Sequence, residues 1–274
     1  MFNDIFNQKE VIITGNSGFK GSWLSLWLKN IGAKVHGISY HPPSNPNMFE
    51  ALKIENKIDS FHQLDIAENY FEVNKIVSNI NPDFVFHLAA QPLVSVSYHN
   101  PLFTIKTNVI GTANILNSIK DLKKEVTSVI ITSDKCYDNL ELERGYNEKD
   151  LLGGKDIYSG SKGAAELIIK SFYYSFFKNH KYKSTIVSAR AGNVVGGGDW
   201  GKDRIVPDAV SSWNQNKKLT IRNPLSTRPW QHVLEPVSGY LTLASKLYLD
   251  KNLNGENFNF GPNETSNKTV KDLI

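Results

Sequence analysis

The most constraining feature of the chain is a glycine-rich turn between a short apolar run and an amphipathic segment. Residues 11–14 have the composition of a buried strand, and Gly15, Gly18 and Gly21 follow with the spacing GxxGxxG. Residues 22–30 then place apolar side chains at helical spacing, so the turn opens a helix whose N-terminal N–H groups can bind a pyrophosphate. We interpret it as the phosphate loop of a dinucleotide site, with an ordinary strand–helix turn as the alternative. The predicted loop residues are Gly15, Ser17, Gly18, Phe19, Lys20 and Gly21.

Strand-like and helix-like segments alternate over the first 190 residues. We expect strands at 11–14, 33–39, 83–87, 126–132 and 185–189, and helices at 22–30, 68–79, 101–122 and 158–177. This alternation indicates an α/β fold, a Rossmann-type doubly wound parallel sheet covered by helices on both faces. Residues 1–190, together with 230–250, are expected to form this cofactor domain.

The alternation stops after about Arg190. Gly196, Gly197 and Gly198 and several prolines indicate loops there. We therefore expect a smaller C-terminal substrate-binding lobe built from residues 191–229 and 251–274. Residues 269–274 look like the opening of a helix, so we expect the chain to be trimmed at its C-terminus.

The composition narrows the class of protein. Of the 274 residues, 40% are hydrophobic and 21% charged, which supports a packed core, and the net charge of +4 comes without a long basic run. We therefore expect no nucleic-acid partner. With no apolar stretch near ~20 residues, we expect no membrane partner either. A single cysteine, Cys136, and an N-terminus unlike a signal peptide indicate a cytoplasmic protein. No His, Cys or Asp cluster has the spacing of a metal site.

The strand expected at 33–39 bears on the choice of cofactor. It ends without the acid that usually holds the adenosine ribose of NAD, and no arginine cluster is available for a 2′-phosphate. We favour NAD over NADP. Asp65 is placed to contact the adenine, and a helix N-cap is the alternative role.

Tyr158 and Lys162 are four residues apart and share one face of the expected helix. A phenol is a weak base at neutral pH, but a neighbouring ammonium and an oxidised nicotinamide both favour the phenolate. Such a phenolate can take a proton from a substrate hydroxyl while hydride leaves the same carbon. A solvated helix pair is the alternative.

Ser133, Asp134 and Lys135 follow the strand expected at 126–132, at the carboxyl end where open α/β sheets place their sites. Ser133 can donate to the same substrate oxygen as Tyr158. The alternative is a charged surface loop.

These motifs, in their order along nearly the whole chain, resemble the extended short-chain dehydrogenase/reductase family. The shared motifs are Gly15-x-x-Gly18-x-x-Gly21, His87-Leu88-Ala89-Ala90, Asn108-Val109-x-Gly111-Thr112, Ser133, Tyr158-x-x-x-Lys162 and Arg228-Pro229-Trp230-Gln231-His232-Val233. Longer blocks, such as 18–23, 133–137, 189–200 and 227–236, are most similar to members of the family that remove water from CDP-glucose.

The resemblance implies an NAD-dependent nucleotide-sugar 4,6-dehydratase that converts CDP-glucose to its 4-keto-6-deoxy product and water by internal hydride transfer. It implies catalytic roles for Ser133, Asp134, Lys135, Tyr158 and Lys162, with Asp134 as the acid for the C6 hydroxyl. Lys135 is the candidate base at C5, or it stabilises the enolate while another group moves the proton. A nucleotide-sugar 4-epimerase and a non-catalytic NAD(P)-binding protein of the same fold are the alternatives.

The resemblance also assigns binding residues and an assembly. It implies cofactor contacts from Asp65, Ile66, Leu88, Ala89, Ala90, Asn108, Tyr158 and Lys162, and substrate contacts from Gln91, Asn193, Arg204, Arg228 and His232. Arginine suits a diphosphate because its fork donates two hydrogen bonds, although Arg204 could instead cap a helix and Arg228 could brace its loop. Family members commonly form homodimers, here expected through the helices at 101–122 and 158–177.

Overall fold

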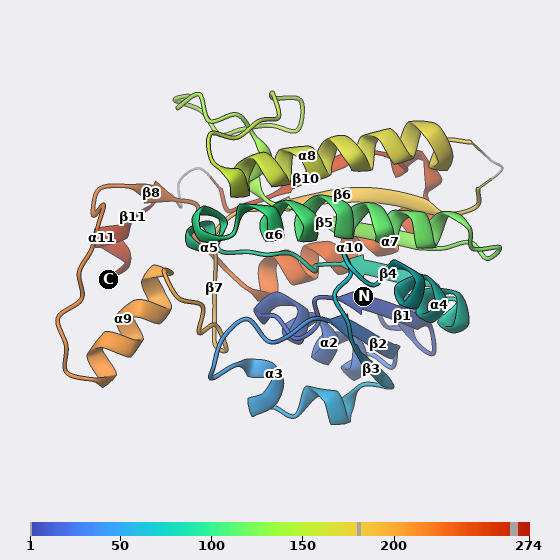
Figure 1. Ribbon diagram of the computed structural model, residues 1–274, viewed down its shortest axis with the longest axis horizontal. Coiled ribbons are helices and arrows are strands. Elements are labelled where there is room, and N and C mark those ends of the chain that lie inside the picture. Colours follow the sequence, from blue (N-terminus) through green and yellow to red (C-terminus); the bar gives the residue numbers. More distant parts are fainter. Residues whose placement is uncertain (1, 180–181, 264–267) are drawn as a thin grey trace.

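Seven parallel strands form the centre of the computed structural model, which describes residues 2–179, 182–263 and 268–274 (Figure 1). The strands are β1 (Glu10–Thr14), β2 (Lys34–Ser39), β3 (Ser60–Gln63), β4 (Phe84–His87), β5 (Thr127–Ile131), β6 (Thr185–Ala191) and β10 (Asn257–Phe260). Their spatial order is β10-β6-β5-β4-β1-β2-β3, and every pair is parallel. The order reverses between β1 and β4, so the expected Rossmann-type sheet is confirmed, with its switch point beside the glycine-rich turn.

Helices bury both faces of this sheet. Val11 and Ile13 of β1 face one apolar cluster, which α2 (Phe19–Asn30) and α10 (Leu234–Leu249) cover. Ile12 faces the other cluster, where the helices α4 (Tyr70–Ile80), α7 (Gly111–Lys120) and α8 (Ile157–Phe172) pack. Because neither face meets water, the central strands are apolar at successive positions.

The helix expected at 101–122 is interrupted. It consists of α6 (Pro101–Ile105), the π-helical turn η2 (Lys106–Ile110) and α7, and α8 likewise ends in a π-helical turn, η4 (Tyr173–Phe177). Asn108 lies within η2 and is buried, where its Oδ1 accepts from the Gln91 N–H at 2.8 Å and its Nδ2 donates to Ser161 Oγ at 2.9 Å. The π turn thus coincides with a buried amide that joins the loop after β4 to the start of α8.

The strand β10 departs from the expectation for residues 251–274. Its residues Asn257–Phe260 pair with Ser188–Ala191 of β6, so this segment belongs to the sheet rather than to the smaller lobe. The packing of Phe258 and Phe260 against the apolar cluster on the α2 and α10 face accounts for this placement.

The remaining elements are short. Around the sheet lie α1 (Asn3–Phe6), α3 (Met48–Ala51), η1 (Ile54–Lys57), α5 (Val94–His99), η3 (Asp134–Cys136) and η5 (Lys251–Leu253). A smaller lobe, at the left of Figure 1, holds α9 (Ile205–Asn214), the antiparallel pair β8 (Thr227–Arg228) and β11 (Lys268–Thr269), and α11 (Val270–Leu273). The short parallel pair β7 (Val194–Val195) and β9 (Gln231–His232) joins this lobe to the sheet.

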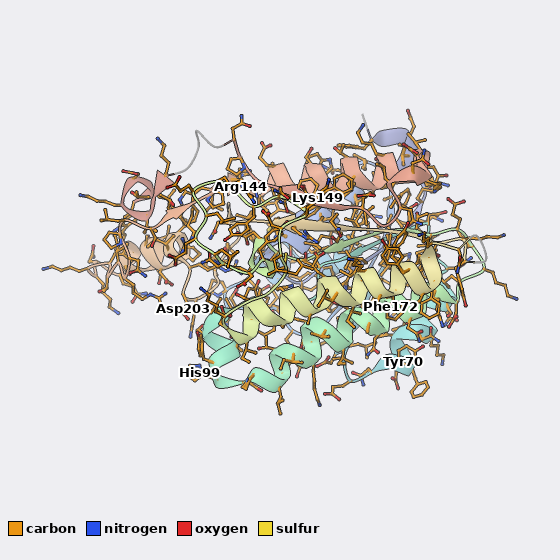
Figure 2. All side chains as sticks on the ribbon, turned by 90° about the horizontal axis from the view of Figure 1, so that it is seen from above. Tyr70, His99, Arg144, Lys149, Phe172 and Asp203 are labelled. Carbon is orange, nitrogen blue, oxygen red and sulfur yellow. The ribbon has the colours of Figure 1, made fainter. Side chains whose placement is uncertain are left out.

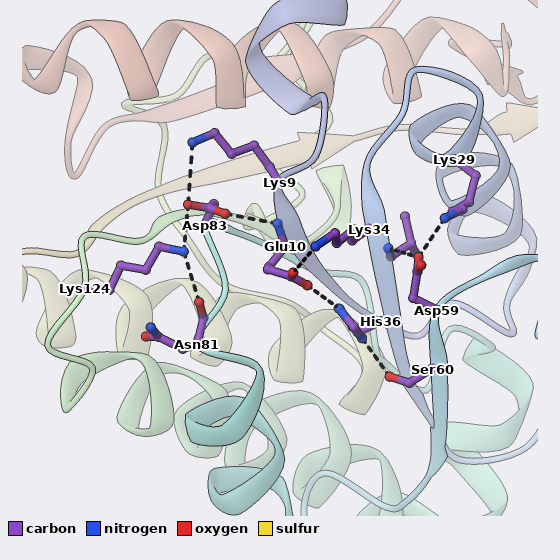
Figure 3. Close-up of polar contacts among 11 residues, drawn as sticks. Lys9, Glu10, Lys29, Lys34, His36, Asp59, Ser60, Asn81, Asp83 and Lys124 are labelled. Carbon is purple, nitrogen blue, oxygen red and sulfur yellow. Dashed lines mark hydrogen bonds and ion pairs between the residues drawn. The ribbon is translucent and has the colours of Figure 1, made fainter.

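Ion pairs tie the amino-terminal edge of the sheet, at the opposite end from the glycine-rich turn (Figure 3). Asp83 accepts the Glu10 N–H at 3.0 Å and pairs with Lys124 at 2.7 Å and Lys9 at 3.8 Å. Glu10 in turn bonds His36 at 2.7 Å. These two carboxylates link the starts of neighbouring strands and so help to hold them in register.

Among the described residues, no helix is long and apolar enough to cross a membrane.

Candidate active site

A cavity of about 1600 Å³ opens at the carboxyl ends of the strands, between the sheet and the smaller lobe. Pockets for one small-molecule ligand typically measure about 300–1,000 Å³, so this larger cavity has room for two ligands side by side. The cavity brings together Gly15, Ser17, Gly18, Phe19, Lys20, Gly21, Asp65, Ile66, Leu88, Ala89, Ala90, Gln91, Ser133, Asp134, Lys135, Tyr158, Lys162, Asn193, Arg204 and Arg228. Nearly all the side chains singled out from the sequence therefore face one space.

Two of the predicted residues do not line the cavity. The side-chain amide of Asn108 is hydrogen-bonded to Gln91 and Ser161, so Asn108 stabilises the cavity wall without facing the cavity. His232 is exposed on β9, and its Nδ1 accepts the Leu234 N–H at 3.3 Å. Neighbouring side chains on a strand point to opposite sides, and Gln231 is the buried one here, so His232 points to solvent.

The phosphate turn is packed so closely that only glycine fits. A Cβ on Gly15, whose φ is +75°, would lie 2.6 Å from the Ala89 backbone nitrogen, and one on Gly21 would lie 2.2 Å from the Gly15 carbonyl oxygen. Gly18 precedes α2, and no side chain caps this helix. The positive end of α2 is thus free of side-chain caps and opens into the cavity, which fits the pyrophosphate of a dinucleotide.

The end of β2 supports the turn. Ser39 Oγ donates to Asn16 Oδ1 at 2.8 Å and accepts the Ser17 N–H at 3.1 Å, and all three residues are buried. Asp65, across the same end of the cavity, accepts the Ala67 N–H at 2.8 Å, which makes a local Asx turn. Asp65 is therefore both a turn residue and part of the cavity wall, while the N-cap of α4 is Asn69.

Tyr158 and Lys162 lie in the first two turns of α8, whose N-cap Asp156 accepts the Ser159 N–H at 3.0 Å. Both side chains are buried, with 8% and 5% of their surface exposed. Burial lowers the pKa of Lys162 to about 8, against the opposing effects of Cys136 and Glu166. At least half of the Lys162 side chains therefore stay protonated at neutral pH, although the site has a low dielectric constant.

The pKa of the Tyr158 phenol is shifted in the direction opposite to the one that the sequence favours. Burial raises its pKa to about 12, although a hydrogen bond with Ser133 acts in the opposite direction. Taking the phenolate out of water costs more than the hydrogen bond with Ser133 contributes, so burial decides the direction of the shift. An oxidised nicotinamide in the cavity would place positive charge beside the phenol and favour the phenolate.

The short helix η3 presents the acid/base residues that follow β5. Ser133 caps it, since its Oγ accepts the Lys135 N–H at 3.2 Å, and the same hydroxyl donates to Asp134 Oδ1 at 3.0 Å. Asp134 is half-buried, whereas Lys135 is exposed. Asp134 is therefore held next to the Ser133–Tyr158 pair, and Lys135 keeps a solvated position at the cavity wall.

Cations gather where a diphosphate would lie. Arg204 precedes α9 and pairs with Asp199 at 2.9 Å, while Arg228 donates to the Thr227 carbonyl at 2.7 Å. Burial, with the charges of Lys162 and Arg204, lowers the pKa of Lys20 to about 8. Asp199 belongs to the same set and is not predicted from the sequence, although its place five residues before Arg204 in a glycine-rich segment is a usable signal.

A Rossmann sheet with a glycine turn after β1, and a Tyr-x-x-x-Lys pair facing the same cavity, define a protein of the extended short-chain dehydrogenase/reductase class. Residues 12–272 match the family model described as GDP-mannose 4,6 dehydratase, and the chain belongs to this family.

Curated relatives agree with this family. The chain is 46% identical over 269 residues to a CDP-glucose 4,6-dehydratase of Salmonella typhimurium, a match that covers 97% of this chain and 74% of the relative. It is 30% identical over 291 residues to a dTDP-D-glucose 4,6-dehydratase of Dictyostelium discoideum, covering 99% of this chain and 62% of the relative.

Solved structures share the fold. A UDP-glucose 4-epimerase of Thermotoga maritima superposes with a TM-score of 0.81 at 22% identity, over 96% of this chain and 79% of that one. A dTDP-glucose 4,6-dehydratase of Bacillus anthracis, solved with NAD, gives a TM-score of 0.77 at 22% identity, over 96% and 78% of the two chains.

Proposed function

We propose that the protein is a CDP-glucose 4,6-dehydratase with NAD as its cofactor. The observation that carries this proposal is the placement of Tyr158, Lys162, Ser133 and Asp134 around one cavity with the phosphate turn. The similarity to the Salmonella enzyme supports CDP-glucose as the substrate. NAD supplies reversible uptake of the two electrons that the sugar gives up at C4 and receives again at C6.

The residues that would hold NAD line the switch point of the sheet. The turn Gly15–Gly21 and the start of α2 would bind its pyrophosphate, and Asp65 and Ile66 would contact its adenine end. Leu88, Ala89 and Ala90 line the cavity beside the turn, and the close approach of the Leu88 and Ala89 backbone to Gly15 leaves no room for a side chain there.

Tyr158 is the base at the sugar C4 hydroxyl. Ser133 bonds the phenol and donates to the same sugar oxygen, and Lys162 one helical turn away stabilises the phenolate. The C4 alcohol becomes a ketone as its proton passes to Tyr158.

The C4 ketone then acidifies the neighbouring C5 hydrogen. Asp134 donates a proton to the C6 hydroxyl, which leaves as water while the C5 proton is removed, so one water is lost per sugar. Lys135 takes the C5 proton or stabilises the enolate while another group takes it. When the electrons return at C6, a proton returns to C5. C4 stays a ketone, so Tyr158 passes its proton to solvent and Asp134 takes up one from solvent, which restores both groups.

The smaller lobe binds the nucleotide. Arg204 and Arg228 bind the diphosphate, and Gln91 and Asn193 contact the sugar from the sheet side. Arg204 pairs with Asp199 in this structure, which holds the guanidinium over the cavity. His232 is exposed here and is assigned no contact.

The protein forms a homodimer in the cytoplasm. The helices α8 and α6–η2–α7 lie side by side on the outside of the molecule (Figures 1 and 2). Their outer surface carries Leu102 and Leu167, which are 69% and 54% exposed, with Ile110 and Tyr174 nearby. Large apolar residues on adjacent exposed helices are typical of a surface that a second subunit covers.

The test is incubation of the protein and NAD with CDP-glucose and, separately, with dTDP-glucose, followed by mass spectrometry. A CDP-glucose 4,6-dehydratase gives a product lighter by one water from CDP-glucose. A 4-epimerase gives an isomer of unchanged mass, and no change in either sugar refutes the proposal.

The variant Asp134→Asn separates the two reactions further. Because the amide cannot protonate the C6 hydroxyl, dehydration is expected to fall by roughly 10²–10⁴-fold. Unaltered turnover in this variant would count against the role of Asp134.

A further inference from the structure

Behind the active site, Glu166 of α8 and Arg190 of β6 form a buried ion pair. Arg190 Nη2 lies 2.6 Å from Glu166 Oε2, and both side chains are 2% exposed or less. Taking two charges out of water is costly, and apolar side chains of similar size often stabilise a protein as well or better. Stability alone therefore does not account for this pair.

The pair contacts both ends of the turn that carries the acid/base residues. Thr132, directly before Ser133, donates its hydroxyl to Glu166 Oε1. Tyr137, directly after η3, accepts from Arg190 Nη1 at 2.8 Å. The guanidinium carbon also lies 5.1 Å from the centre of the Tyr137 ring. The entry and the exit of residues 133–136 are thus bound to one ion pair.

Other contacts fix the pair itself. Ser188 Oγ donates to Glu166 Oε2 at 3.0 Å, and the Tyr137 hydroxyl donates to Asn259 Oδ1 at 2.6 Å. The network therefore links the segment that follows β5 to β6, β10 and α8, so a shift of the 133–136 turn relative to α8 has to break several buried hydrogen bonds.

Glu166 also follows Lys162 by one helical turn on the face that carries Tyr158. Among the described residues, the other ionisable groups near Lys162 are Tyr158 on the same helix, Lys20 from α2, His87 from β4 and Cys136 from η3. Of these, Lys20 is a cation, and burial lowers the pKa of His87 to about 3, which leaves it neutral. Glu166 is thus the carboxylate that opposes the effect of burial on the pKa of Lys162.

We propose that Glu166 and Arg190 are positioning residues for the dehydration: the pair fixes the Ser133–Lys135 turn opposite Tyr158, and its carboxylate keeps negative charge beside Lys162. This inference rests on the proposed function. Neither residue lines the cavity, so both act through the groups that do.

The experiment compares Glu166→Gln, Arg190→Gln and the double variant that carries both substitutions. Each single variant leaves one buried charge unpaired and is expected to lower the unfolding temperature. The double variant has no buried charge, so its unfolding temperature is expected to recover. Its kcat is expected to stay lower by on the order of 100-fold, the loss associated with a shift of about 1 Å in a catalytic group. Its KM is expected to remain within about threefold of wild type, because the nucleotide contacts are elsewhere.

Two readouts distinguish positioning from a purely structural role. The basic limb of the pH profile is expected to move down by roughly one pH unit in the double variant, because Lys162 loses its neighbouring carboxylate. Hydrogen–deuterium exchange in residues 132–138 is expected to rise, and this measurement requires no turnover. A double variant with recovered stability and wild-type kcat, pH profile and exchange would overturn the inference.

Further variants keep the test decisive. Glu166→Asp retains the negative charge but moves the carboxylate away from Thr132. We therefore expect kcat to fall while the basic limb of the pH profile stays in place. A wild-type kcat in this variant would overturn the positioning role even if the double variant does not fold. Asp83→Asn is the matched control, since it removes an ion pair at the opposite edge of the sheet and is expected to change stability alone (Figure 3). A wild-type protein without dehydratase activity would refute the proposed function, and the exchange experiment would still test the placement of the turn.

Discussion

Replacing Gly21 by alanine tests whether the close packing of the phosphate turn binds the cofactor. The new Cβ would lie 2.2 Å from the Gly15 carbonyl oxygen and 2.8 Å from the Asn16 Cα. Non-bonded heavy atoms are most stable about 3.5 Å apart, so the start of α2 has to move away from the turn by roughly 1 Å. Both colliding groups are backbone atoms, and no side-chain rotation relieves the contact.

The expected loss follows from the hydrogen bonds that this movement disrupts. If two N–H groups no longer reach the pyrophosphate, the loss is about 3 kcal/mol, since each bond to a charged group contributes about 1.5 kcal/mol. The Kd for NAD is then expected to rise roughly 100-fold. Isothermal titration of NAD into the folded variant measures this change, with circular dichroism to verify folding.

Two other glycines provide graded controls. A Cβ on Gly18 would lie 3.3 Å from the Gly15 oxygen, so Gly18→Ala is expected to weaken NAD binding only slightly. A Cβ on Gly145 meets nothing within 4 Å among the described residues, so Gly145→Ala should leave the Kd unchanged. If Gly21→Ala bound NAD within threefold of wild type, the steric reasoning would be refuted.

Two further predictions concern buried polar groups. Because burial lowers the pKa of Lys162 to about 8, its ammonium is present below that pH and is lost as the pH rises through it. We therefore expect kcat/KM to fall above about pH 8, and we expect Lys162→Arg to remove this basic limb of the pH profile. A basic limb that persists in the variant would belong to another group. The Tyr240 hydroxyl is fully buried without a hydrogen-bond partner among the described residues. Tyr240→Phe is therefore expected to raise the free energy of unfolding, measured by urea titration, by about 1 kcal/mol. A clear loss of stability in this variant would contradict the prediction.

The central strands could be predicted from sequence because helices cover both faces, which leaves unbroken apolar runs such as 84–86 and 129–131. The strand β3, with the sequence SFHQ at the edge of the sheet, has no such run, and its register comes from pairing with β2. Pro207 is one of the prolines that indicate loops after about Arg190, but it lies in the first turn of α9, where a helix tolerates proline.

The site was predictable wherever spacing carries the chemistry. The glycine turn, the Tyr158–Lys162 pair and the 133–135 turn each have fixed offsets, and the structure places them on one cavity. The Glu166–Arg190 pair and the π turn at Asn108 were not predictable, because they depend on contacts between segments far apart in the chain. The direction of the Tyr158 pKa also required the burial of the phenol to be known.

The path of the chain between the two lobes limits how the crevice can open. The polypeptide leaves the sheet after β6, returns before α10, and leaves again after β10 to reach β11, which pairs with β8. The polypeptide therefore crosses between the two lobes three times, whereas a single linker would let the lobes move freely relative to each other. Admission of a nucleotide sugar then calls for small coordinated changes in all three connections, and a substitution that stiffens one of them should slow substrate entry and product release together.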